Sequence, residues 1–175
     1  MSITLDDVVA LYERWGTHNY DEELSQLAHA EQTAALAVAA GADEAIVLAA
    51  LLHDLGHLLY LDGTATGPHE TTGPAYLGEL FGDDINSPIA LHVEAKRYLC
   101  ATDSAYYASL SEGSKRSLTR QGGPLDANGM SAFEAQTAAD AAIALRRWDD
   151  GGKVDGLAVA PFTDYVPLLT RHALL

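Results

Sequence analysis

Three ionisable residues, His53, Asp54 and His57, lie within an almost continuously apolar stretch, LAALLHDLGHLLY. A buried charge without a partner costs several kcal/mol or is neutralised by a shift of its pKa, so these side chains require partners. A metal cation is one such partner, because imidazole nitrogen and carboxylate oxygen are ordinary metal ligands. The alternative is a structural histidine whose ring N–H donates to the aspartate. Three such residues in one apolar segment favour the metal site.

Other segments offer enough ligands to complete such a site. Together with His53 and Asp54 they give four histidines and two aspartates on separate segments, a pattern typical of a dimetal centre in a helical bundle. Each residue alone would more often be structural or solvated, as we expect for His18 and His172. Six ligands exceed the need of one tetrahedral ion, so the pattern predicts two metals that share Asp54, and ligation without cysteine favours iron or manganese over structural zinc. The additional candidates are His29, His69, His92 and Asp149.

The charge distribution indicates what kind of ligand would bind. The formal net charge of −15 argues against a nucleic acid partner, which would be repelled at long range. Seven of the ten lysines and arginines lie between positions 96 and 147, and most are expected to be solvated. Lys96 is the exception, because it lies one helical turn after His92 and therefore on the same face. A small anion close to the metals is the ligand that this placement suggests.

The elements that must position these residues are all helical, because apolar residues recur with the period of a helix and no strand-like alternation stands out. The stretch over 43–61 is apolar on nearly every side and should be buried as one helix, from which His53 and Asp54 would project about 100° apart. A loop is expected at 62–68. The Ser/Gly content rises between 111 and 130, where QGGP at 121–124 is expected to form a turn or a nest-forming loop. The other expected helices are 4–15 with Thr4 as its cap, 26–40 ending at Gly41, 69–81, 87–100 with Ser87 as its cap, 131–149 and a tail helix at 164–175.

A chain of 175 residues suits one compact domain. Cys100 is the only cysteine, which excludes an intrachain disulfide and a thiolate metal cluster. The first residues lack the pattern of a secretory signal, and the apolar runs are interrupted by His and Asp before they reach the length of a membrane span. We therefore expect a cytoplasmic protein without a membrane or nucleic acid partner, either a monomer or a weak homodimer.

The order H…HD…H…H…D resembles the HD-domain superfamily, whose usual members are metal-dependent phosphohydrolases. Several segments are similar to one branch, the mixed-valent di-iron oxygenases of phosphonate catabolism, and myo-inositol oxygenase is a more distant relative. HD alone is a weak signal, but its combination with the other segments is specific, and the similarity extends from residue 20 to about 153. The segments are QLAHAEQTAALA, LLHDLGH, HETTGPAYLGELF, LHVEAKRYLC, SLTRQGGP and LRRWDDGGK.

The resemblance implies a single all-α HD domain over residues 1–175, with a lid-like segment at 17–26, a core at 27–153 and the tail helix. It implies one iron held by His29, His53, Asp54 and Asp149, and a second that Asp54 bridges to and that His69 and His92 complete. The pair would be mixed-valent, Fe(II)/Fe(III), with O2 as co-substrate.

The resemblance also implies roles for residues that face the substrate. His57 and Lys96 would contact it and act with Asp54 in catalysis. Tyr20 and Glu23 would belong to the lid, where the tyrosine can cap an iron and the acid can hold a substrate ammonium. The remaining phosphonate contacts would be Ser114, Gln121 and Arg146.

The reaction implied is oxidative cleavage of the C–P bond of a 1-hydroxyphosphonate to phosphate and a carboxylate such as glycine or glycine betaine. An amino, trimethylammonio or hydroxymethyl phosphonate would all be compatible with the same ligands. An HD phosphohydrolase that uses these ligands to activate water is the main alternative. A non-catalytic regulatory HD module would require the loss of ligands, and all of them are present.

Overall fold

The computed structural model describes residues 3–19 and 24–174, and these residues form α-helices joined by turns, which confirms the all-α prediction. The only pairing of extended backbone among them is an isolated antiparallel bridge between Asn19 and Ser25. The helices are α1 (Leu5–Trp15), α2 (Gln26–Ala39), α3 (Glu44–Leu52), α4 (Leu55–Asp62), α5 (His69–Leu77), α6 (Asp83–Thr102), α7 (Ser104–Ser109), α8 (Glu112–Arg120), α9 (Ala127–Glu134), α10 (Ala139–Gly151) and α11 (Phe162–His172).

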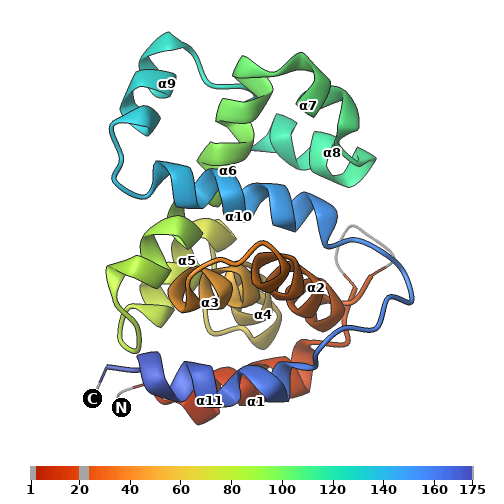
Figure 1. The fold of residues 1–175 in the computed structure, drawn as a ribbon, viewed down its shortest axis with the longest axis vertical. Coiled ribbons are helices and arrows are strands. Elements are labelled where there is room, and N and C mark those ends of the chain that lie inside the picture. Colours follow the sequence, from red (N-terminus) through yellow and green to blue (C-terminus); the bar gives the residue numbers. More distant parts are fainter. Residues whose placement is uncertain (1–2, 20–23, 175) are drawn as a thin grey trace.

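Helix α10 crosses the middle of the molecule (Figure 1). It packs against α6, α2 and α3, so that one helix contacts elements from very different parts of the chain. Helices α7, α8 and α9 lie on one side of it and α2 to α5 on the other, with α1 and α11 farther out beneath them (Figure 1). The side of α10 that faces α2 and α3 therefore meets the most apolar part of the sequence.

The apolar stretch that was predicted as one helix over 43–61 is two helices, and this prediction is wrong at its centre. Helix α3 ends at Leu52 and α4 begins at Leu55, so that His53 and Asp54 form the turn between them. Asp54 has φ −100° and ψ 11°, outside the helical region. Apolar periodicity missed the break because the residues on both sides of it are equally buried. The candidate ligands thus project from a turn and not from one helix face.

By length and composition the stretch Glu44–Asp62 would pass as a membrane span, but most of it is buried inside the protein. The break at Asp54 interrupts it as well. It is therefore best described as the central segment of the core, as its apolar pattern predicted.

Other expected boundaries differ for local reasons. The helix predicted over 131–149 is α9 and α10 separated by a turn, and α6 begins at Asp83, which places Pro88 inside the helix and removes Ser87 as its cap. The helix predicted over 69–81 ends at Leu77, followed by a turn. Region 111–130, noted for its Ser and Gly content, contains α8 with a Ser111 cap and the start of α9, and QGGP at 121–124 forms the predicted turn. Serines and glycines there serve as helix caps or occupy the first turn of a helix.

Candidate metal centre

Two glycines bring α4 and α5 into direct backbone contact. A Cβ added to Gly56 would lie 2.4 Å from the carbonyl oxygen of His69 and 2.5 Å from its Cα, and one added to Gly73 would lie 3.2 Å from the Gly56 nitrogen. Only residues without a side chain allow helices to approach this closely. The contact places His69, the first residue of α5, beside the His53–Asp54 turn.

One group of ligand atoms, termed here the first metal position, comprises His29, His53 and Asp149. Their ligand atoms lie within 4.8 Å of one another, and all three residues are buried. His29 Nε2 is 3.3 Å from Asp149 Oδ1, and Oδ2 of Asp54 lies 3.6 Å from His29 Nε2 and 3.5 Å from His53 Nε2. Ligands at right angles around an ion with bonds of about 2.1 Å lie roughly 3 Å apart, close to these separations.

The other oxygen of Asp54 faces a second group, termed the second metal position. Oδ1 is 3.3 Å from His69 Nε2 and 3.9 Å from His92 Nε2, and these two ring nitrogens are 3.0 Å apart. His57 Nε2 is 3.8 Å from the same oxygen, so by distance alone His57 approaches Asp54 as closely as His92 does. Asp54 therefore lies between the two groups with one oxygen directed to each, as a bridging carboxylate must.

Backbone carbonyls orient three of the imidazoles. Nδ1 of His29 lies 2.8 Å from the Gly152 oxygen, Nδ1 of His53 lies 2.8 Å from the Ala50 oxygen, and Nδ1 of His92 lies 2.6 Å from the Ile89 oxygen. Each Nδ1–H donates to a carbonyl, which leaves the Nε2 lone pair directed at the centre. Metal-binding histidines are commonly held in this way.

Gly152 reaches His29 because its backbone lies against α2. A Cβ on Gly152 would lie 2.6 Å from Thr33 Oγ1 and 3.0 Å from the Thr33 nitrogen. The glycine thus permits the approach that delivers its carbonyl to the histidine ring.

The donor set fits metal ions. His53 Nε2 is buried without a hydrogen-bond partner while its Nδ1 is occupied, which is the state of a nitrogen that needs a cation. Imidazole and carboxylate together, without thiolate, suit iron and similar ions. His29, His53, Asp149 and Asp54 can hold one ion, and Asp54, His69 and His92 a second.

The ionisation of three of these groups suits ligation, because metals bind carboxylate anions and neutral imidazoles. His29 differs, because burial would lower its pKa but Asp149 and Asp54 outweigh burial and raise it. Burial would raise the pKa of Asp54, but the neighbouring imidazoles of His53, His57 and His69 hold this pKa well below its usual value. Burial lowers the pKa of His92 to about 4 and that of His69 well below its ordinary value. Asp54 and these two imidazoles are therefore in the protonation state that a metal requires.

A pocket of about 130 Å³ opens beside both metal positions. His57 and Lys96 line it, together with residues along the whole length of α8. Lys96 is 2% exposed, and its Nζ donates to Ser117 Oγ at 2.8 Å. Lys153 Nζ lies 3.2 Å from Ser114 Oγ and 3.6 Å from Asp149 Oδ1. The pocket thus has metal ligands at one end and cations with hydroxyl groups at the other.

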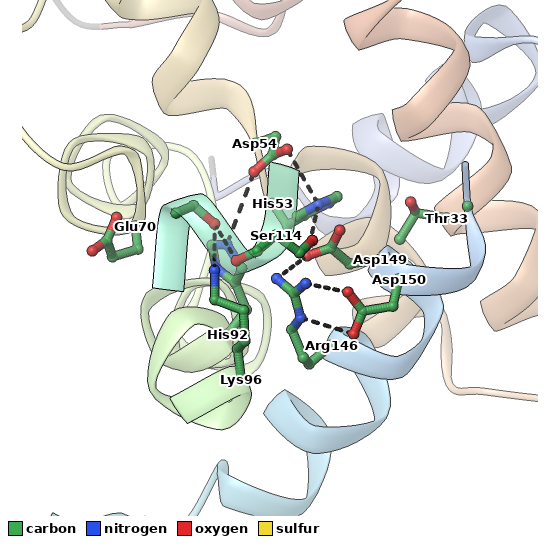
Figure 2. A network of polar contacts seen from close by, with 12 residues as sticks. Thr33, His53, Asp54, Glu70, His92, Lys96, Ser114, Arg146, Asp149 and Asp150 are labelled. Carbon is green, nitrogen blue, oxygen red and sulfur yellow. Dashed lines mark hydrogen bonds and ion pairs between the residues drawn. The ribbon is translucent and has the colours of Figure 1, made fainter. Parts of the chain in front are cut away.

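The structure brings together all six predicted metal ligands, and Figure 2 shows His53, Asp54, His92 and Asp149 around one centre. The five predicted substrate contacts that the structure describes all line the pocket. Tyr20 and Glu23 lie outside the described residues, although Leu24, Ser25 and Gln26 at the end of the lid-like segment also line the pocket. The five are His57, Lys96, Ser114, Gln121 and Arg146.

Sequence reasoning missed several residues of the site. Lys153, Ser117 and Arg120 line the pocket without having been singled out. The sequence could have indicated Lys153, because this lysine follows the predicted ligand Asp149 by four residues, at the end of the LRRWDDGGK segment. Of the weaker histidines, His18 is exposed and packs its ring near Trp15, and His172 pairs with Glu44 at the surface.

Two phosphonate dioxygenases are among the known proteins that are similar to this chain along most of its length. A hydroxymethylphosphonate dioxygenase from Gimesia maris is 40% identical over 168 residues, which cover 90% of this chain and 84% of the relative. The (1-hydroxy-2-(trimethylamino)ethyl)phosphonate dioxygenase (glycine-betaine-forming) from Leisingera caerulea is 35% identical over 168 residues, covering 92% and 86%. No protein-family model matches the chain.

The backbone contact at Gly56 yields a first prediction. Gly56→Ala should push α5 away, lower the free energy of unfolding by about 1–3 kcal/mol, as overpacking does, and weaken metal binding at the second position. Thermal unfolding and metal stoichiometry measure the two effects. Gly129→Ala is the control, because its Cβ would meet the flexible Leu125 side chain at 3.2 Å and should be tolerated. Equal, small effects of the two variants would contradict a structural role for the contact.

Proposed function

The chain belongs to the family of the phosphonate dioxygenases, and on this premise we propose that it uses O2 to cleave the C–P bond of a 1-hydroxyphosphonate. The products are phosphate and the carboxylate formed from the hydroxylated carbon. The balance closes without another reductant: hydroxymethylphosphonic acid plus O2 equals formic acid plus phosphoric acid. The observation that supports the proposal best is the pocket itself, where ligands for two metals meet cationic side chains.

Two irons are the metals that we propose. The first position would hold one ion through His29, His53 and Asp149, the second would hold another through His69 and His92, and Asp54 would bridge them. Bound iron supplies the one-electron chemistry that reaction with O2 requires and that no side chain of the pocket can provide. A mixed-valent Fe(II)/Fe(III) pair is the state that we infer for the active enzyme.

The phosphonate end of the substrate is assigned to the side of the pocket formed by α6, α8 and the end of α10. Two ammonium groups, those of Lys96 and Lys153, already lie against the hydroxyls of Ser117 and Ser114. Charge-assisted hydrogen bonds from such donors suit a tetrahedral anion. Gln121 also lines this region, where its side-chain NH2 group can donate to a phosphonate oxygen. A bound phosphonate would be fixed here, with its hydroxylated carbon directed toward Asp54.

His57 is assigned to the substrate and not to a metal. It lines the pocket, and burial lowers its pKa, so its imidazole is neutral and can donate or accept one hydrogen bond at the substrate hydroxyl. His92, in contrast, is 1% exposed with its ring fixed by the Ile89 carbonyl, which suits a permanent ligand. Leucines of α3 and α4 on the far side of the ligands exclude water from the reacting atoms.

The phosphohydrolase alternative would use the same ligands, and the named relatives argue against it. We expect iron-loaded protein to release phosphate from hydroxymethylphosphonate or from its trimethylammonioethyl analogue only when O2 is present. One O2 should be consumed for each phosphate, as an oxygen electrode and a phosphate assay will show. Release of phosphate without O2 uptake, or turnover of a phosphate monoester, would support the hydrolase instead.

The bridging carboxylate leads to a prediction about metal content. Protein purified without O2 should contain two irons per chain, and Asp54→Ala should lose both, because neither position keeps a complete set of ligands. Iron analysis and Mössbauer spectroscopy measure the content and the oxidation states. Asp83→Ala, an exposed residue in the first turn of α6, is the matched control. An active protein with one metal per chain would contradict the bridge.

Lys96 yields a prediction that depends on pH. Burial, with Arg146 nearby, lowers the pKa of Lys96 to about 8, against the opposing effect of Asp149 and Asp150. Below this pH the ammonium should contribute a hydrogen bond of about 1.5–3 kcal/mol to a phosphonate, so Lys96→Ala should lower kcat/KM about ten- to a hundredfold. Above it the wild-type lysine is neutral, so the difference between the two proteins should shrink as the pH rises through about 8. Steady-state kinetics over this pH range measure both.

The control for the Lys96→Ala variant must be a cationic residue whose side chain does not hold the fold together. Arg97 follows it in the sequence, but its Nε donates to the Gly123 oxygen at 2.7 Å and holds the QGGP turn. Arg116 on α8 is exposed and is the better control, and Arg116→Ala should leave kcat/KM nearly unchanged. Similar, small effects of Lys96→Ala and Arg116→Ala at neutral pH would remove the phosphonate role of Lys96.

A further inference from the structure

Arg146 connects the first metal position to residues that do not reach the pocket. Its Nη1 donates to Asp149 Oδ2 at 2.6 Å, its Nη2 donates to Asp150 Oδ1, and its Nε lies 3.1 Å from Asp150 Oδ2 (Figure 2). The guanidinium therefore donates to Asp150 from two nitrogens and to Asp149 from the third. Every nitrogen of the guanidinium already donates to a carboxylate, although the side chain also lines the pocket.

Tyr106, from α7, closes this network from outside α10. Its hydroxyl donates to Asp150 Oδ2 at 2.5 Å and accepts from Arg146 Nε at 3.1 Å. The tyrosine ring is 6% exposed and packs with Leu99 and Leu110, so the hydroxyl is held in place by a rigid group. Asp150 and Arg146 are four residues apart on α10, and Tyr106 is their contact with a different helix.

The network leaves one side of Asp149 for the metal. Its Oδ2 accepts from Arg146, while Oδ1 faces His29 Nε2 at 3.3 Å and Lys153 Nζ at 3.6 Å. An aspartate near the end of a helix can rotate about its side-chain bonds, and a charged hydrogen bond to one oxygen restricts that rotation. Asp150 matters for charge as well as for geometry, because it shares the positive charge of Arg146 with Asp149. Without Asp150, Arg146 would be neutralised by Asp149 alone and would compete with the metal for it.

We propose that Tyr106 and Asp150 are positioning residues that, through Arg146, fix the direction and the charge of Asp149 at the first metal position. The inference rests on the proposed function only in requiring that a metal binds there. Neither residue touches the substrate, because neither lines the pocket. The effect of Tyr106 should therefore appear in metal affinity and kcat and not in the KM for a phosphonate.

The test is an anaerobic titration of metal-free protein with Fe(II), followed by equilibrium dialysis. Wild type should bind two irons. Tyr106→Phe, which keeps the ring, and Asp150→Asn, which keeps the shape, should each weaken one of the two binding steps by up to about tenfold, the lower end of the effect of removing a direct partner of a metal ligand, because both residues act through Arg146. The other step should remain near wild type, and the KM of fully loaded Tyr106→Phe for hydroxymethylphosphonate should be unchanged.

Tyr107→Phe is the matched control, since Tyr107 is the next residue of α7 and is 46% exposed. It should bind both irons like wild type, and circular dichroism should show that all three variants are folded. Wild-type affinity at both steps in Tyr106→Phe would overturn the proposal, as would equal weakening of both steps together with a fall in Tm. If Asp150→Asn does not fold, Tyr106→Phe alone decides. The titration contains no phosphonate, so its result does not depend on the proposed reaction. A wild-type protein that binds iron but does not turn over phosphonates would refute the proposed function, and the comparison of iron affinities between the variants would still test the positioning role.

Discussion

The structure depends on one partly buried carboxylate, that of Asp54, whose side chain is 17% exposed and lies among imidazoles in the least polar part of the chain. Burial disfavours the ionised form of Asp54, but the surrounding histidines favour it and lower the pKa of this carboxyl group. Its two oxygens face different sets of rings, so a single side chain links both metal positions. The interruption between α3 and α4 places Asp54 at a turn, from which both of its oxygens are accessible to neighbouring helices. The placement of the other ligands follows from this centre.

Backbone contacts make the arrangement rigid. Carbonyls of Ala50, Ile89 and Gly152 fix three rings, and the first two of these carbonyls come from the turn that precedes the histidine itself. The third comes from far along the chain and depends on a glycine that fits against Thr33. Ligands fixed through main-chain atoms do not depend on the rotamers of other side chains, which limits how far they can drift when a metal leaves.

Helix α10 links the metal positions to the pocket. It provides Asp149 to the first metal position, Arg146 to both regions, and Lys153 just after its end. The chain is strongly acidic as a whole, yet several cationic side chains line the pocket beside the metal positions, so the local field there opposes the global one. This local field suits the small anionic substrate that we propose.

The sequence by itself determined the helical class, the six candidate ligands and the position of Lys96 near His92. It did so because buried ionisable residues in apolar helices stand out locally, and because a turn of helix relates residues three and four apart. Tertiary structure alone decided the break at His53 and Asp54, which apolar periodicity cannot register when both sides are buried. It also decided the partnership of His29 with Gly152 and of Arg146 with Tyr106. The first contact joins residues 123 positions apart in the chain and the second joins residues 40 positions apart. Only the packing of α10 against α2 and α6 brings such segments together.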